Sequence, residues 1–429
     1  MCFIRRLALA IVCLSSPQLQ AAEALPDRLD FNLVMKLVDE GDYYESLLAK
    51  SELDRAASDK LLVDGLNDFN INLVALAQYV KPSEVLTEEI NDDHRLSVVV
   101  QKTLFDFGFS GEKSQAVESR VSAAKLLLKQ IRLSKRVEVA SKFFDIKLSD
   151  LKYFLDNEAI ATAYVKFNKT QERNELKQAS DVELLKAEFE YQQVRARRYE
   201  SETLQRISRA RFAESISRPD DLPEEVILPD FSYFSRKRPE YDDLLKIVMS
   251  NNLQIRAQQQ LLEAASHELS ASRKKNGSTL STELELTEFS SESPTKNNWK
   301  ASLKYSVPLY ENDSAKAVTA RALSEWQKQK AQLQHIESEI RQQLLEVWQQ
   351  IYVLKARQDI DEVAEEYREL YQDRSRAYYE MEYRTDLGDS FVRVSEARLE
   401  KFKNNFSLAL AWMKLSMLTG VTLEEYLLQ

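Results

Sequence analysis

Residues 299–309 read Trp-Lys-Ala-Ser-Leu-Lys-Tyr-Ser-Val-Pro-Leu, and the segment from 314 to 384 that follows contains neither glycine nor proline. In the first segment apolar residues alternate with lysine or serine, and this period of two predicts a β-strand with one apolar face. In the second, apolar residues recur about every 3.5 positions, which is typical of a helix that packs along a partner helix. Such a helix is on the order of 100 Å long. No single globular core has that length, so these two segments decide the fold class.

The same order of elements is predicted in the first half of the chain, at an offset of roughly 205–210 residues. Each half contains a helix, two strands, a long helix, a break and a partner helix. The predicted strands cover residues 69–79, 96–105, 280–289 and 299–309. The predicted helices cover residues 31–66, 112–174, 180–215, 241–272, 314–384 and 389–418. Because each long helix is followed by a break and a second helix, we expect two antiparallel coiled-coil hairpins.

The domain organisation follows from one Pro-rich segment, residues 218–240, which contains four prolines. Such a segment predicts a linker. We therefore expect a first structural repeat at 23–217 and a second at 241–429.

The first 22 residues resemble a secretory signal peptide. Two arginines precede a short apolar run, and small residues place the cleavage site between Ala21 and Ala24. The chain has two cysteines, Cys2 and Cys13, and both lie in this segment, so we expect no disulfide in the processed protein.

Composition excludes several classes of function. The formal charge of -10 argues against nucleic-acid binding, which requires a basic surface. The three histidines, His94, His267 and His335, have no spacing typical of metal ligands. Residues 110–113 match S-x-x-K, but neither the S-D-N motif nor the K-T-G motif that accompanies it in β-lactamases is present. The sequence also contains no P-loop and no G-x-G-x-x-G motif. We therefore expect no enzyme activity, no cofactor and no metal.

Strands of about ten residues are long enough to cross a bilayer when tilted. Periodicity alone leaves two interpretations open. The four strands form either a soluble sheet with one hydrated face or part of a membrane barrel that several chains close together, because lipid cannot satisfy an open strand edge.

Four segments carry a resemblance to the outer membrane efflux protein family, the TolC-like channels. Residues 96–106 resemble the family's second strand and its run into a helix, and residues 305–310 resemble the fourth strand with its Pro-Leu-aromatic ending. Residues 383–398 and 172–188 resemble its two periplasmic turns. The order, spacing and repetition of these segments cover nearly the whole chain after the signal.

The resemblance implies a mainly α-helical protein with a membrane β-barrel portion. Three chains with four strands each would form a 12-stranded barrel in the outer membrane of a Gram-negative bacterium, and the helices would form a tunnel into the periplasm. The implied function is the exit duct of a tripartite export system, for type I protein secretion or efflux. The implied partners are a periplasmic adaptor and an inner-membrane ABC or proton-driven transporter. The alternative is a periplasmic coiled-coil adaptor or scaffold protein.

The resemblance also nominates functional residues. Hairpin-tip residues expected to contact the adaptor are Lys177, Ser180, Asp181 and Gly388, with Lys177 in place of the family's usual glycine. Residues expected to gate the periplasmic entrance are Asp386, Asp389, Arg393 and Glu396. Arg393 departs from the family's acidic pattern, so we hypothesise that it pairs with Glu396 to hold the entrance closed. An ordinary exposed pair on one helix is the alternative.

Overall fold

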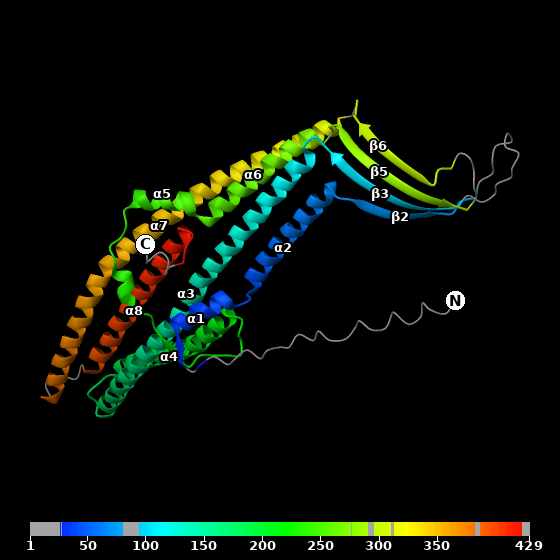
Figure 1. The fold of residues 1–429 in the computed structure, drawn as a ribbon. Coiled ribbons are helices and arrows are strands. Elements are labelled where there is room, and N and C mark those ends of the chain that lie inside the picture. The colour runs from blue at the N-terminus through cyan, green and yellow to red at the C-terminus, as the bar shows by residue number, and fades with distance from the viewer. Residues whose placement is uncertain are drawn as a thin grey trace, which may run out of the picture.

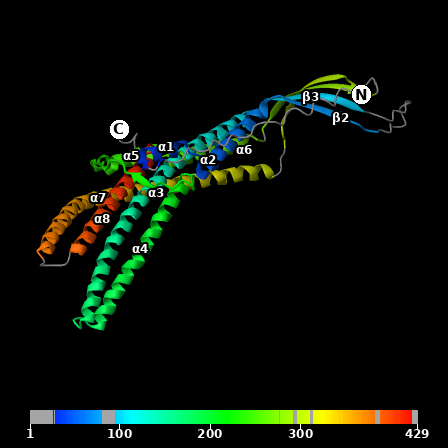
Figure 2. The ribbon, with the colours of Figure 1, turned by 90° about the horizontal axis from the view of Figure 1, so that it is seen from below.

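The protein is described by a computed structural model that covers residues 26, 28–79, 94–275, 277–290, 296–309, 313–381 and 387–422. The expected signal peptide and Asp386 lie outside these described residues. Figures 1 and 2 show a curved sheet at one end of an elongated molecule and the turns of two helical hairpins at the other end.

Two helices of 67 residues each, α3 (Phe109–Glu175) and α7 (Ser314–Glu380), run away from the sheet and confirm the predicted long helices. Both segments are rich in good helix formers, and α3 carries its single glycine, Gly111, in the first turn, where a glycine costs little. Gly108 precedes α3 with a φ of 89°, a conformation that glycine adopts without strain, and it turns the chain from strand to helix.

Each long helix turns back as a hairpin, as predicted. Helix α4 (Asp181–Ser215) packs along α3, and helix α8 (Leu387–Leu418) packs along α7 and also against α3. A capping box begins α4: the Ser180 hydroxyl accepts from the Glu183 N–H, and the Glu183 carboxylate accepts from the Ser180 N–H.

The opening helix of each half is interrupted, whereas the sequence predicted one continuous helix at 31–66 and one at 241–272. The first is divided into α1 (Phe31–Glu40) and α2 (Tyr44–Asp64), followed by a short 3₁₀ turn, η1 (Gly65–Asn67). The second is divided into α5 (Tyr241–Asn251) and α6 (Leu253–Lys274). The physical reason is local capping: the Asn252 side chain accepts from the N–H groups of Gln254 and Ile255 and so begins a new helix.

Four strands form one antiparallel sheet in the order β2-β3-β5-β6. Their bounds are β2 (Asn70–Leu76), β3 (Arg95–Phe105), β5 (Thr279–Phe289) and β6 (Trp299–Ser306). Strand β6 ends before Pro308, which has no N–H to donate to a ladder, so the predicted strand at 299–309 was too long.

The prediction of four strands per chain was incomplete. Two three-residue strands, β1 (Arg28–Asp30) and β4 (Glu225–Ile227), pair in parallel, and β4 lies in the expected linker together with the 3₁₀ turn η2 (Phe231–Ser235). A strand of three residues is too short to show a period of two, so neither strand could be predicted from its residue pattern.

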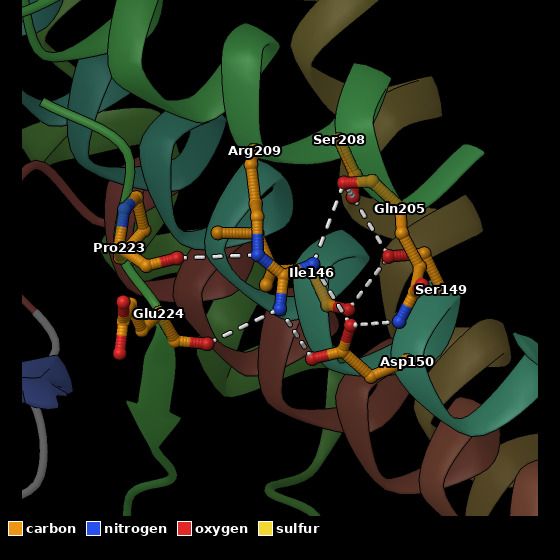
Figure 3. A network of polar contacts seen from close by, with 8 residues as sticks. All are labelled: Ile146, Ser149, Asp150, Gln205, Ser208, Arg209, Pro223 and Glu224. Atoms are coloured by element: carbon orange, nitrogen blue, oxygen red, sulfur yellow. Dashed lines mark hydrogen bonds and ion pairs between the residues drawn. The ribbon is translucent and has the colours of Figure 1, made fainter. Parts of the chain in front are cut away.

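The main hydrophobic core lies midway along the helices, where segments distant in sequence meet. Phe144 of α3 stacks on Phe31 of α1 with ring centroids 5.5 Å apart and on Phe406 of α8 at 4.6 Å. Figure 3 shows how the linker is attached beside this core. The Arg209 guanidinium of α4 binds the Asp150 carboxylate of α3 at 2.8 and 3.0 Å and donates to the carbonyls of Pro223 and Glu224.

Candidate functional sites: a two-faced sheet and the hairpin turns

The register of the four-stranded sheet separates apolar from polar residues. Residues directly opposite in an antiparallel sheet share a face. Two rows on one face are apolar across all four strands: Ile71, Val100, Leu284 and Ala301, and then Leu73, Val98, Leu286 and Trp299. Ile71 is 67% exposed and Trp299 68%, so the described part of the chain leaves this face uncovered.

The opposite face is polar and internally bonded. Its rows are Asn70, Gln101, Glu283 and Ser302, and then Asn72, Val99, Glu285 and Lys300. The Gln101 amide donates to Glu283 at 2.8 Å, and Lys300 lies 3.9 Å from the same carboxylate. The sheet therefore offers one face suited to an apolar environment and one suited to water.

Both edges of this sheet are open among the described residues. Strand β2 pairs only with β3, and β6 pairs only with β5. Unpaired N–H and C=O groups along an edge are satisfied by water or by another strand.

The junction between sheet and helices holds a network of charges. The Glu112 carboxylate of α3 accepts from Lys274 at 2.7 Å and lies 2.8 Å from His267 Nδ1 of α6. Hydrogen bonds from Lys274 and then His267 hold the pKa of Glu112 below its usual value. His267 thus has a carboxylate partner, and among the described residues no group of three or more His, Cys, Asp and Glu side chains is arranged to hold a metal ion.

The turn between α3 and α4 places Lys177 in the left-handed region, with a φ of 59°. The Lys177 N–H donates to Asn174 O at 2.9 Å and the Gln178 N–H to Arg173 O at 2.7 Å, the pattern of a Schellman motif whose turning residue is commonly glycine. The Asn174 amide also donates to the Asp181 carboxylate at 3.0 Å. The Ser180 N–H and hydroxyl hold the pKa of Glu183 below its usual value.

At the second hairpin, α8 begins against α3. A Cβ atom on Gly388 would lie 2.8 Å from the Thr162 hydroxyl, so only glycine fits here without movement. The Ser395 hydroxyl donates to Glu158 of α3. Asp389 borders a cavity of about 280 Å³ between α3, α4 and α8 that also contains Lys166 and Arg197. Side chains of both charge signs line this cavity.

Arg393 and Glu396 are both exposed on α8, and no ion pair joins either to another described residue. The structure therefore does not bring this pair together within the chain.

Sequence reasoning missed a buried polar contact between α7 and α8. Asn404 of α8 donates to the Leu354 carbonyl of α7 at 3.1 Å, while Asn404 Oδ1 and Asp361 Oδ2 are buried acceptors that receive no hydrogen bond. Burial raises the pKa of Asp361. The only indication in the sequence was one polar residue, Asn404, among the apolar residues of α8.

Among the described residues, no helix is both long enough and apolar enough to cross a membrane.

No protein-family model matches the sequence, and no curated protein matches it either. Solved structures do match. The outer membrane protein VceC from Vibrio cholerae is 17% identical, with a TM-score of 0.73 over 92% of this chain and 96% of that one. The Campylobacter jejuni CmeC outer membrane channel is 12% identical, with a TM-score of 0.73 over 95% and 90%. CusC, described in connection with transmembrane channel formation, is 13% identical with a TM-score of 0.74 over 91% and 92%.

These matches extend over nearly the whole of both chains, and the matched structures are outer-membrane or channel proteins. The sheet, the long helices and the two hairpins have the arrangement found in TolC-family outer membrane channels, and that is the fold of this chain.

Proposed function

We propose that three copies of this chain form an exit duct in the outer membrane of a Gram-negative bacterium. One observation carries the proposal: the four-stranded sheet is apolar on one face, polar on the other and, among the described residues, open at both edges. An apolar face suits lipid, a polar face suits a water-filled lumen, and closure into a barrel removes the edges.

The strand directions support closure between copies. Strand β2 runs away from the helices and β6 runs back toward them, so β6 of one copy pairs with β2 of the next in the antiparallel sense. Three sheets of four strands give a 12-stranded barrel. Strands β3 and β5 have 11 residues each, which matches the roughly 9–11 residues that a tilted strand needs to cross a bilayer.

The helices give the duct its reach below the membrane, and the hairpin turns form its periplasmic entrance. In this proposal the two repeats, 23–217 and 241–429, contribute one hairpin each, and the linker at 218–240 lies around the middle of the helices. The tip residues Lys177, Ser180, Asp181 and Gly388 contact a periplasmic adaptor. The adaptor connects the duct to an inner-membrane ABC or proton-driven transporter, for type I protein secretion or efflux.

Acidic residues near the entrance, Asp386 and Asp389, concentrate cations in a narrow pore. Since Arg393 and Glu396 are exposed and form no ion pair with another described residue, we place their contact between subunits. Reversing either charge alone should raise the permeability of the cells to antibiotics. Reversing both charges together should return the permeability to the level of the unchanged protein. If none of the three variants changes export or permeability, the two residues have no part in gating.

The sheet assignment is tested with adjacent cysteines in β6. Leu303 lies on the apolar face and Ser302 on the polar face. In outer membranes, a water-soluble maleimide should label Ser302→Cys through the lumen and leave Leu303→Cys unlabelled, while a lipid-soluble maleimide should label Leu303→Cys. Equal labelling of both by the water-soluble reagent would mean a hydrated sheet, and the adaptor or scaffold interpretation would replace the duct.

A further inference from the structure

A cavity between α6 and α7, close to the sheet, has no role in the function proposed above. Its volume is about 490 Å³. It lies where α6 ends and α7 begins, next to β5 and β6 (Figure 1). Its lining includes two basic side chains, two hydroxyls and two leucines: Arg273, Lys316, Ser272, Thr319, Leu269 and Leu323. Basic groups and hydroxyls together suit the oxygens of a phosphate, and the leucines suit hydrocarbon.

Both cations of the cavity can receive an anion. Arg273 is exposed in the last turn of α6, and its side chain forms no hydrogen bond or ion pair with another described residue. Lys316 pairs with Asp313 at 3.2 Å, but the two side chains are 87% and 94% exposed, and a pair of this kind contributes little. The first turn of α7, which carries Lys316, adds the positive end of a helix dipole. The cavity is therefore suited to an anionic group.

Two backbone hydrogen bonds near the end of β5 show how the sheet is oriented. Side chains alternate along the strand, so Ser290 continues the apolar face of Leu284, and Thr287 belongs to the polar face. The Ser290 N–H donates to His94 O beside β3 at 2.9 Å. The Thr287 N–H donates to Asn298 O beside β6 at 2.9 Å. An L-residue with its side chain toward the viewer on a rising strand points its N–H to the right. The strands therefore follow as β6, β5, β3 and β2 from left to right, when the apolar face is viewed with the helices below.

The cavity opens on the apolar side of the sheet. Helices α7, α6 and α3 follow from left to right like their strands, because α6 packs between α7 and α3. Viewed along α6 toward the sheet, successive residues advance clockwise by about 100°. His267 and Lys274 face α3, and Gln258 faces α7. Arg273 then lies on the flank of α6 that faces the same way as the apolar face.

The cavity also lies at the depth of lipid headgroups in the proposed barrel. Leu284, the central residue of β5, lies near the middle of the bilayer, and Thr279 begins the strand five residues below it. Five residues rise roughly 13 Å along the membrane normal at a tilt of about 40°, and half the hydrocarbon layer is about 15 Å thick. Tyr305, also on the apolar face, hydrogen-bonds Ser278 at 3.2 Å, and tyrosine favours this boundary. Arg273, six residues before Thr279, therefore lies in the headgroup layer.

We infer that this cavity binds the headgroup of an anionic phospholipid from the periplasmic leaflet of the outer membrane. Arg273 and Lys316 hold the phosphate oxygens, and the acyl chains pass upward along the apolar face of β5 and β6. The inference rests on the proposed duct, and it adds a specific lipid site to each subunit.

Native mass spectrometry of the full chain, purified in detergent, tests this site. Phosphatidylglycerol is the probe, and phosphatidylcholine with the same acyl chains is the comparison, because its headgroup carries a compensating cation. We expect the trimer to retain phosphatidylglycerol at several-fold lower lipid concentration than phosphatidylcholine. Arg273→Gln with Lys316→Gln should weaken this binding by about tenfold or more, because two charge-assisted contacts are lost.

The matched control is Lys275→Gln with Arg321→Gln. It also removes one lysine and one arginine that are exposed on the same two helices, but neither lines the cavity. This control should bind phosphatidylglycerol like the unchanged protein. Arg273→Lys with Lys316→Arg keeps both charges and should retain more binding than the glutamine variant. Equal loss in these two cavity variants would contradict a phosphate site held by charge.

The same spectra separate this inference from the proposed function. A trimer that binds the two lipids equally, or that loses phosphatidylglycerol equally in the control variant, overturns the lipid site and leaves the duct intact. Displacement of phosphatidylglycerol by inorganic phosphate at a similar concentration would mean a site for a free anion, and would also overturn the lipid site. Absence of a trimer overturns the duct and the lipid site together.

Discussion

A single charge placed on the apolar face of the sheet should prevent stable membrane insertion, whereas the same charge one residue away should not. Ile71 shares its row with Val100 and Leu284, which are the central residues of the two 11-residue strands β3 and β5. This row therefore lies near the middle of the bilayer in the proposed duct. An arginine facing lipid at the midplane costs about 2–4 kcal/mol, so Ile71→Arg should destabilise a trimer by roughly 6–12 kcal/mol in total.

The matched control is Asn72→Arg, which changes the adjacent residue on the polar face, opposite Val99 and in the same row as Glu285. There the guanidinium stays in water and near carboxylates, so the expected cost is small. The assay is urea unfolding of the protein in lipid vesicles, combined with the yield of heat-resistant trimer in outer membranes. Equal destabilisation by both variants, or a larger effect of Asn72→Arg, would refute the assignment of the two faces.

Three further predictions concern the helices. Lys177→Gly should stabilise the first hairpin by about 0.5–1 kcal/mol relative to Lys177→Ala, because glycine adopts a positive φ without strain; thermal unfolding measures the difference. Arg209→Lys loses the planar fork that binds Asp150 and two linker carbonyls, so the linker at 218–240 should become more sensitive to protease, and an unchanged cleavage rate would contradict this. Burial raises the pKa of Asp361, so its contribution to stability is present below the pKa of the unfolded chain and is lost as the pH rises through the folded pKa. Asp361→Asn should therefore increase the hydrogen-exchange protection of α7 and α8 more at pH 7 than at pH 4. An equal increase at the two pH values would contradict this prediction.

The elements with a regular period could be predicted from sequence alone. The alternation in 299–309 and the seam in 314–384 are local signals, and the strand β6 and the helix α7 are where these patterns place them. Strand ends were less certain, because the pattern continues through Pro308 while the ladder does not.

Features that depend on contacts between distant segments could not be predicted. The β1–β4 pair joins segments almost 200 residues apart, whereas the breaks at Gly41 and Asn252 are set by local caps that the helical period does not show. Similarly, the pairing of His267 with Glu112 needs α3 and α6 side by side.

The candidate functional residues also divide into those that the sequence could single out and those that it could not. Lys177 could be singled out because it replaces a glycine at a turn, and its positive φ gives that substitution a physical meaning. The hypothesis that Arg393 pairs with Glu396 rests on their alignment to the family's constriction, and an alignment does not decide whether two exposed side chains meet.

Fractionation of cells that express this chain, followed by mass determination of the extracted protein, shows directly whether the chain is a trimeric duct in the outer membrane. We expect a trimer in the outer-membrane fraction that only detergent releases. A monomer or dimer in the soluble periplasmic fraction would contradict the proposed duct and would make the four-stranded sheet an ordinary hydrated one.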